Sequence, residues 1–204
     1  MQKRWGDEAR KELPWLIFPS TAAPTFYSPI TRRHHPLDAR GARCLGSGDG
    51  GWLVLALDSL HSHLLYNLNI GRRIPLPPNF TTPEDKDFPL VVRTATISAP
   101  PSPNSNNPYM VAAIVLVANR STAAFWSEGT DYWFSTGPLL TGRSQNVIYH
   151  GGAFFFVTSN EEVISFRPTY GWNYSVNLAR VDYDMQQRGD FDNDIGVVEG
   201  MAWA

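Results

Sequence analysis

Hydrophobic residues in this chain are grouped in short runs, which glycine, proline, asparagine and aspartate separate. Runs of this length with β-branched and aromatic residues are typical of strands and too short for core helices. One short helix is expected at residues 6–13, because Pro14 ends it. Without helices between them, neighbouring strands should pair antiparallel, so we predict an all-β fold. The predicted strands cover residues 15–18, 42–45, 52–57, 63–68, 91–98, 109–118, 122–126, 131–135, 146–150, 153–158 and 162–167.

Two stretches repeat one pattern, in which a glycine pair precedes an apolar strand, a turn and a second strand. The first begins at Gly50-Gly51 and the second at Gly151-Gly152, and a third strand cluster over residues 109–135 lies between them. Repeats spaced by about 45 to 60 residues are typical of kelch-like propeller blades. We therefore predict a partial kelch-like β-propeller of about three antiparallel blades. The expected parts are a short N-terminal segment (1–14), the partial propeller (15–180) and an acidic C-terminal tail (181–204).

Composition agrees with a folded β-protein and narrows its partners. The chain has 204 residues, of which 43% are hydrophobic and 18% charged, so it is not a disordered polypeptide. A formal net charge of -2 excludes a strongly basic nucleic-acid binder. The charge is uneven, because residues 1–43 carry 8 basic and 4 acidic groups, whereas residues 180–204 carry 2 basic and 6 acidic groups.

The sequence also favours an intracellular protein, cytoplasmic or nuclear, that does not bind membranes. No apolar run is long enough to span a bilayer, and the N-terminus lacks the apolar core of a secretory signal. The single cysteine, Cys44, forms no internal disulfide and fits a reducing compartment. We therefore interpret the glycosylation sequons at Asn79, Asn119 and Asn173 as chance matches.

Two motifs resemble ligand sites. Gly46–Gly51 satisfies the G-x-G-x-x-G pattern of dinucleotide sites, but it opens a strand where that site needs a helix, so a tight glycine turn is favoured. Asp190, Asp192 and Asp194 resemble the start of a calcium loop. Ile195 and Met201 then stand where the loop needs glycine and glutamate, so a solvated acidic tail is favoured.

Histidines and arginines supply the remaining candidates. Metal sites need three or four converging ligands, so the pairs His34-His35 and His61/His63 are interpreted as surface histidines in turns. Arg32-Arg33 and Arg72-Arg73 either contact a phosphate or an acidic partner, or form solvated turns. No nucleophile elbow or zinc-protease helix is present. We expect no enzyme activity, no catalytic residue, no cofactor and no metal.

Several motifs together resemble a known family. A Gly-Ser turn precedes a Trp-Leu strand in Cys44–Leu53, and Arg73–Pro78 contains Ile-x-Leu-Pro-Pro. Further similarities lie in Leu65–Asn69, in Ala124-Phe125 with Gly129 and Trp133, in Val147–Phe155 and in Pro14–Pro19. Across roughly residues 12–170, these motifs resemble the plant F-box-associated β-propeller family of the KIB type, formerly a domain of unknown function.

The resemblance implies a non-enzymatic protein-interaction module, because full-length relatives are substrate receptors of ubiquitin ligases. It implies a protein client, and a ligase adaptor only if an F-box is supplied elsewhere. We expect a truncated propeller without an F-box, since no helical bundle precedes Trp15 and no closing strand ends the chain. The alternative is a small-molecule or glycan-binding propeller whose exposed aromatic rings stack on sugars. Those aromatic residues, which otherwise pack between blades, are Trp126, Tyr132, Trp133, Trp172 and Tyr174.

Overall fold

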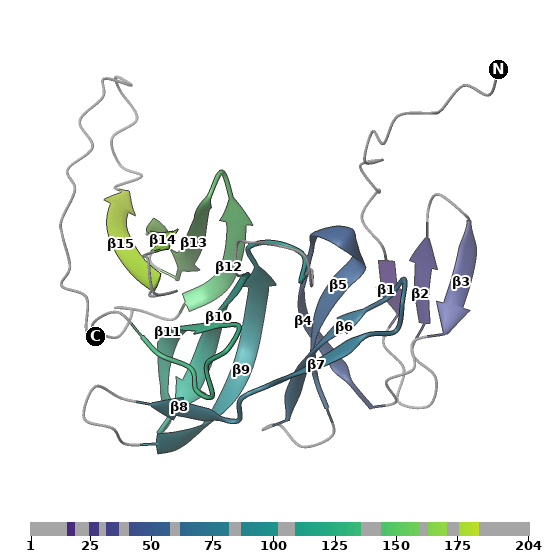
Figure 1. Ribbon diagram of the computed structural model, residues 1–204, viewed down its shortest axis with the longest axis horizontal. Helices are drawn as coiled ribbons and strands as arrows, with labels where there is room; N and C mark the ends of the chain where they lie inside the picture. The colour runs from purple at the N-terminus through teal and green to yellow at the C-terminus, as the bar shows by residue number, and fades with distance from the viewer. Residues whose placement is uncertain are drawn as a thin grey trace. The chain divides into compact units, whose positions relative to one another are not determined.

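The computed structural model contains strands and turns, and its described residues form two separate units. It describes residues 16–18, 25–28, 32–36, 41–57, 62–81, 87–101, 109–135, 144–159, 163–170 and 176–183. The two units are Met1–Ala42 and Arg43–Ala204. Every sheet pairs its strands antiparallel (Figure 1), which confirms the all-β prediction.

The unit Met1–Ala42 contains one small sheet. Its strands are β1 (Leu16–Phe18), β2 (Thr25–Ser28) and β3 (Arg33–Pro36), in the order β1-β2-β3. Tyr27 of β2 lies opposite His34 of β3. This hairpin therefore places an aromatic residue and an imidazole side by side across two strands.

The unit Arg43–Ala204 begins with a four-stranded meander, the β4–β7 sheet. It consists of β4 (Arg43–Gly48), β5 (Trp52–Ala56), β6 (His63–Asn67) and β7 (Arg73–Leu76), in sequential order. The turn from β4 to β5 is a short 3-10 segment, Asp49–Gly51. Gly50 and Gly51 have φ values of 71° and 77° there, which favours glycine over any residue with a Cβ.

The second meander, the β8–β11 sheet, curls so that a short segment after β11 bridges its two edges. Its strands are β8 (Asn79–Thr81), β9 (Asp87–Ile97), β10 (Met110–Val117) and β11 (Arg120–Ser127). Residues 133–134 follow β11 and bridge the two edges: Trp133 pairs with Phe80 of β8, and Phe134 pairs with Phe125 of β11. Four backbone hydrogen bonds of 2.8 to 3.0 Å hold these bridges. The sheet is therefore closed into a small ring.

The third meander, the β12–β15 sheet, repeats the sequential order. It contains β12 (Ser144–His150), β13 (Ala153–Thr158), β14 (Val163–Tyr170) and β15 (Val176–Tyr183). The two-residue turn Gly151-Gly152 joins β12 to β13 with φ values of 57° and 83°, as the glycine-pair repeat predicts. The three meanders are the three antiparallel blades of the predicted partial propeller.

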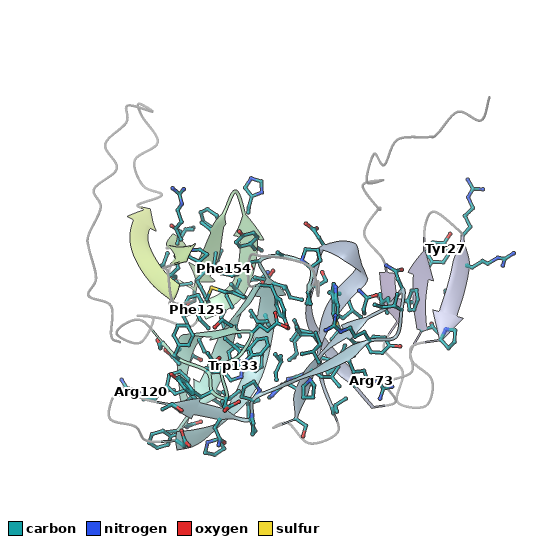
Figure 2. The ribbon with its side chains drawn as sticks, viewed as in Figure 1. Tyr27, Arg73, Arg120, Phe125, Trp133 and Phe154 are labelled. Atoms are coloured by element: carbon teal, nitrogen blue, oxygen red, sulfur yellow. The ribbon has the colours of Figure 1, made fainter. Side chains whose placement is uncertain are left out.

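The β8–β11 sheet lies between the other two sheets of its unit (Figure 1), and side chains from β10 alternate between two cores. Val111, Ala113 and Val115 join the core toward the β4–β7 sheet. Met110, Ala112 and Ile114 join the core toward the β12–β15 sheet, in which the Phe125 ring lies 5.8 Å from the Phe154 ring (Figure 2). Strand β10 is therefore buried on both faces, which explains its continuous apolar run.

Some strand predictions were wrong or missing. Residues 131–135 form no named strand and supply the isolated bridges at Trp133 and Phe134 instead. The structure adds strands that no apolar run indicated, namely β2, β3, β7, β8 and β15. The predicted helix at residues 6–13 lies outside the described residues, and the predicted bounds of the three parts remain predictions. In the described part of the chain, no helix is long and apolar enough to cross a membrane.

Candidate interaction surface

Asn67, the last residue of β6, fixes the loop that follows it. Its side-chain Oδ1 accepts hydrogen bonds from the backbone N–H groups of Asn69 (2.9 Å) and Ile70 (3.1 Å). Its Nδ2 donates to the carbonyl oxygen of Gly50 at 3.0 Å, which ties this loop to the β4–β5 turn. The backbone of Asn67 also accepts from Gly71 N–H and donates to the carbonyl oxygen of Arg72. Hydrogen bonds therefore hold both ends of the loop over residues 68–72.

This fixed loop presents an isoleucine to solvent. Ile70 is 71% exposed, the highest value among the large exposed hydrophobic residues of the described chain. Arg72 and Arg73 follow it and are exposed as well, and the Arg73 guanidinium lies 5.7 Å from the centre of the Tyr66 ring. A cation–π contact of this kind limits the freedom of the Arg73 side chain. An apolar side chain and two cations thus project from one rigid element.

A second loop, residues 128–132, lies at the same end of the unit. The Tyr109 ring lies 5.8 Å from the ring of Trp126 on β11, close to this second loop. Burial, and then Glu128 of the second loop, raises the pKa of Tyr109, whereas Arg72 of the first loop lowers it. Trp126 donates its indole N–H to the carbonyl oxygen of Thr130 at 2.9 Å, which anchors this second loop on β11. We call residues 68–72 and 128–132 together the loop surface.

The glycine motif has a packing role that the sequence did not reveal. Gly46 and Gly48 lie inside strand β4, and only Gly50 and Gly51 form the expected turn before β5. A Cβ added at Gly46 would overlap the carbonyl oxygen of Ala95 on β9. Gly46 therefore allows two strand backbones to approach closely, and a strand rather than a helix follows the motif, as predicted.

The interpretation of the histidines as surface residues was wrong for His63. His63 is 3% exposed, and its Nε2 accepts a hydrogen bond from Val92 N–H at 3.3 Å, linking β6 to β9. His63 is buried because all residues of strand β6 are buried, on both of its faces. His34 is exposed on β3. Among the residues that the structure describes, no group of three metal-ligating side chains converges.

Two of the aromatic residues offered for sugar stacking are buried. Trp126 is 4% exposed and Trp133 is 0% exposed, and the Trp133 indole N–H donates to the carbonyl oxygen of Pro77 at 2.9 Å. Both belong to the core between two sheets. They therefore pack between blades, which was the other role considered for these aromatic residues. Tyr132 is 44% exposed and remains accessible. Trp126 and Trp133 are therefore not accessible for stacking on a sugar, which weakens the glycan-binding hypothesis.

The structure describes some of the remaining candidate residues and not others. Cys44 lies in β4, where burial raises the pKa of its thiol, and its Sγ donates to the carbonyl oxygen of Gly46 at 3.5 Å. Asn79 begins β8, and Asn119 lies in the exposed turn before β11. Several candidates lie outside the described residues: His61, Trp172, Asn173, Tyr174, Asp190, Asp192 and Asp194.

Sequence reasoning missed the residues that build the loop surface. The sequence motif placed Asn67 only at the end of a strand. An asparagine followed by Asn69 and Gly71 is, however, also a turn signal. Ile70 follows Tyr66 and Leu68 at strand spacing, but Asn69 and Gly71 on either side of it are turn residues, so the sequence did not mark it as an exposed anchor. The position of Glu128 near Tyr109 depends on how the strands pair, and the local sequence contains no signal for that.

A comparison with curated proteins found no match. The family model described as KIB1-4 beta-propeller matches residues 23–193, which is most of the 204-residue chain. The match spans all three meanders and most of the glycine, tryptophan and tyrosine motifs from which the resemblance was inferred. It agrees with the stacked four-stranded sheets of the unit Arg43–Ala204. This chain therefore belongs to the KIB1-4 beta-propeller family.

Proposed function

We propose that this chain is a non-enzymatic protein-interaction module, whose loop surface binds a protein client for ubiquitin ligation, as F-box-associated propellers do. Family membership supports the class of function. The observation that carries the proposal is Ile70, which is 71% exposed on a loop that Asn67 holds in one conformation. The proposal includes an intracellular location and no nucleic-acid or membrane partner.

A rigid loop with an exposed aliphatic residue suits protein binding for an energetic reason. Single exposed apolar residues are ordinary on protein surfaces, so exposure alone is weak support. The hydrogen bonds to Asn67 fix the backbone before a partner arrives, and a preorganised loop loses less conformational entropy on binding. Arginine beside an apolar anchor is a frequent composition at the centre of protein interfaces. Ile70 and Arg72 are therefore the expected centre of contact.

The test is affinity purification from cells, with quantitative mass spectrometry of the bound proteins. Ile70→Asp and Arg72→Glu should each lower recovery of the same client about tenfold, which matches the loss of one interface anchor. Ile148→Asp is the matched control, because Ile148 is a 50% exposed isoleucine on β12, outside the loop surface. Loss of the same proteins from the Ile148→Asp sample, or no loss from either loop variant, would refute the loop surface as the binding site.

The ubiquitin-ligase part of the proposal has its own measurement. Where an F-box supplied elsewhere links this chain to a ligase, depleting the protein should raise the abundance of the recovered client, and a proteasome inhibitor should remove the difference between depleted and normal cells. If client abundance does not respond to depletion, the ligase role is wrong, whereas binding at the loop surface is still judged by the purification.

A further inference from the structure

The β2–β3 hairpin of the unit Met1–Ala42 carries a basic group that the proposed function does not use. Arg32 precedes β3 and Arg33 begins it, and both side chains are exposed. Neither arginine forms an ion pair with another described residue, and the described residues of this unit include no aspartate or glutamate. Among the described residues of this unit, no carboxylate therefore neutralises the two cations of the hairpin.

The backbone at Arg32 is in a conformation that disfavours arginine. Its φ is 53°, in the left-handed region where a Cβ crowds the following carbonyl group. Glycine would adopt this conformation without that crowding. An arginine at a strained position beside Arg33, a second exposed cation, points to a role in binding rather than in stability.

The neighbouring ring pair gives the hairpin a defined surface. The rings of Tyr27 and His34 lie 5.1 Å apart with their planes tilted by 49°. The two residues are directly opposite each other across β2 and β3 (Tyr27 is labelled in Figure 2). This contact joins the two strands next to the turn, in which Arg32 lies and after which Arg33 begins β3.

We propose that the β2–β3 hairpin binds an acidic segment of a partner protein, with Arg32 and Arg33 contacting its carboxylate or phosphate oxygens. Guanidinium groups form short, charge-assisted hydrogen bonds with both kinds of oxygen. A nucleic acid fits less well, because the net charge of the chain is -2 and the Tyr27 ring already packs against His34 instead of offering an open face to a base. The site shares no residue with the loop surface and does not depend on the proposed function.

The experiment measures binding of the full chain to fluorescent probes by anisotropy. The probes are an oligoglutamate peptide, a phosphoserine-rich peptide of the same length and an oligouridine RNA, each at low and high salt. We expect both peptides to bind more tightly than the RNA, and the better peptide identifies carboxylate or phosphate as the preferred group. Tighter binding of the RNA, or no binding of either peptide, would overturn the proposal.

Three variants separate a binding role from a structural one. Arg32→Gly removes the cation and supplies the residue that suits the backbone, so peptide binding should fall about tenfold while thermal stability stays equal or rises. Arg33→Gln should weaken binding similarly and covers the case in which Arg32→Gly perturbs the fold. Arg120→Gln is the control, because Arg120 is an exposed arginine of the other unit and its loss changes the net charge equally. Equal weakening in all three variants would show a general charge effect and refute a site on the hairpin.

Discussion

Gly46→Ala should destabilise the protein strongly, because this glycine lies against the backbone of a neighbouring sheet. The new Cβ would overlap the Ala95 carbonyl oxygen and lie 2.9 Å from its carbonyl carbon. Both atoms are backbone of β9, so no side chain can rotate away. The clash is relieved only if β4 and β9 move apart by about 1 Å or more, since ordinary contacts of this kind are well above 3 Å.

The magnitude follows from what that separation disrupts. Strands β4 and β9 hold the core between their two sheets, which includes Leu45, Trp52 and Val92. A gap of 0.5–1 Å forfeits about a quarter to a half of the dispersion energy of the contacts across it. Added to the usual cost of overpacking, about 1–3 kcal/mol, the loss should reach roughly 3 kcal/mol or more. This is a large share of the free energy of unfolding of a typical domain, about 5–15 kcal/mol.

The assay is urea unfolding followed by tryptophan fluorescence, because Trp52, Trp126 and Trp133 are all buried. With an m-value of about 2 kcal/mol/M, the midpoint should fall by roughly 1.5 M. Gly129→Ala is the control: Gly129 has a φ of 92° and nothing within 4 Å of its added Cβ, so only backbone strain of about 1 kcal/mol applies. A cost for Gly46→Ala no larger than that of Gly129→Ala would refute the close-approach explanation.

Further predictions concern the stability of three variants. Tyr109→Phe should leave stability unchanged or raise it by about 1 kcal/mol, because the Tyr109 hydroxyl is buried without a hydrogen-bond partner in the described chain; a clear loss in urea unfolding would contradict this. Burial raises the pKa of Tyr109, so above pH 10.0 the unfolded chain loses this proton more readily than the folded chain and the wild-type free energy of unfolding should fall. Tyr109→Phe lacks this proton and should therefore unfold less readily in alkali than wild type. Asn67→Ala should cost about 2–4 kcal/mol and speed amide exchange in residues 68–72, since three side-chain hydrogen bonds are lost; unchanged exchange there would show that the loop is held by other contacts. Ala118→Gly should stabilise by about 0.5–1 kcal/mol, because Ala118 has a φ of 46°, and a lower melting temperature would count against this.

The parts of the fold that the sequence predicted are those with a local signal. Strands such as β5, β10 and β13 are continuous apolar runs, since both of their faces are covered or nearly so. Strand β7 was missed because it is a short edge strand containing Pro75, which a sheet tolerates only at its margin. Strand β15 was missed because Asn177, Arg180 and Asp182 interrupt its apolar residues, so it forms no apolar run; its pairing partner is β14.

The candidate sites depended more on long-range pairing. His63 looked like a surface residue, because its partner Val92 is supplied by a different sheet. The role of Gly46 depends in the same way on Ala95, which lies almost fifty positions further along the chain. The exposed arginines at residues 32–33 and 72–73 were visible from the sequence, but only the backbone angle at Arg32 and the fixed loop before Arg72 distinguish them from ordinary solvated turns.

The ring closed by Trp133 and Phe134 has a consequence for the order in which the protein assembles during synthesis. Every pairing partner of this ring lies between Asn79 and Phe134, so the ring needs nothing from the β12–β15 sheet. Translation delivers Trp133 and Phe134 after both edges that they join. The β8–β11 sheet can therefore close while the third meander is still being made, and a ribosome-bound chain would then hide both of its edges from neighbouring nascent chains.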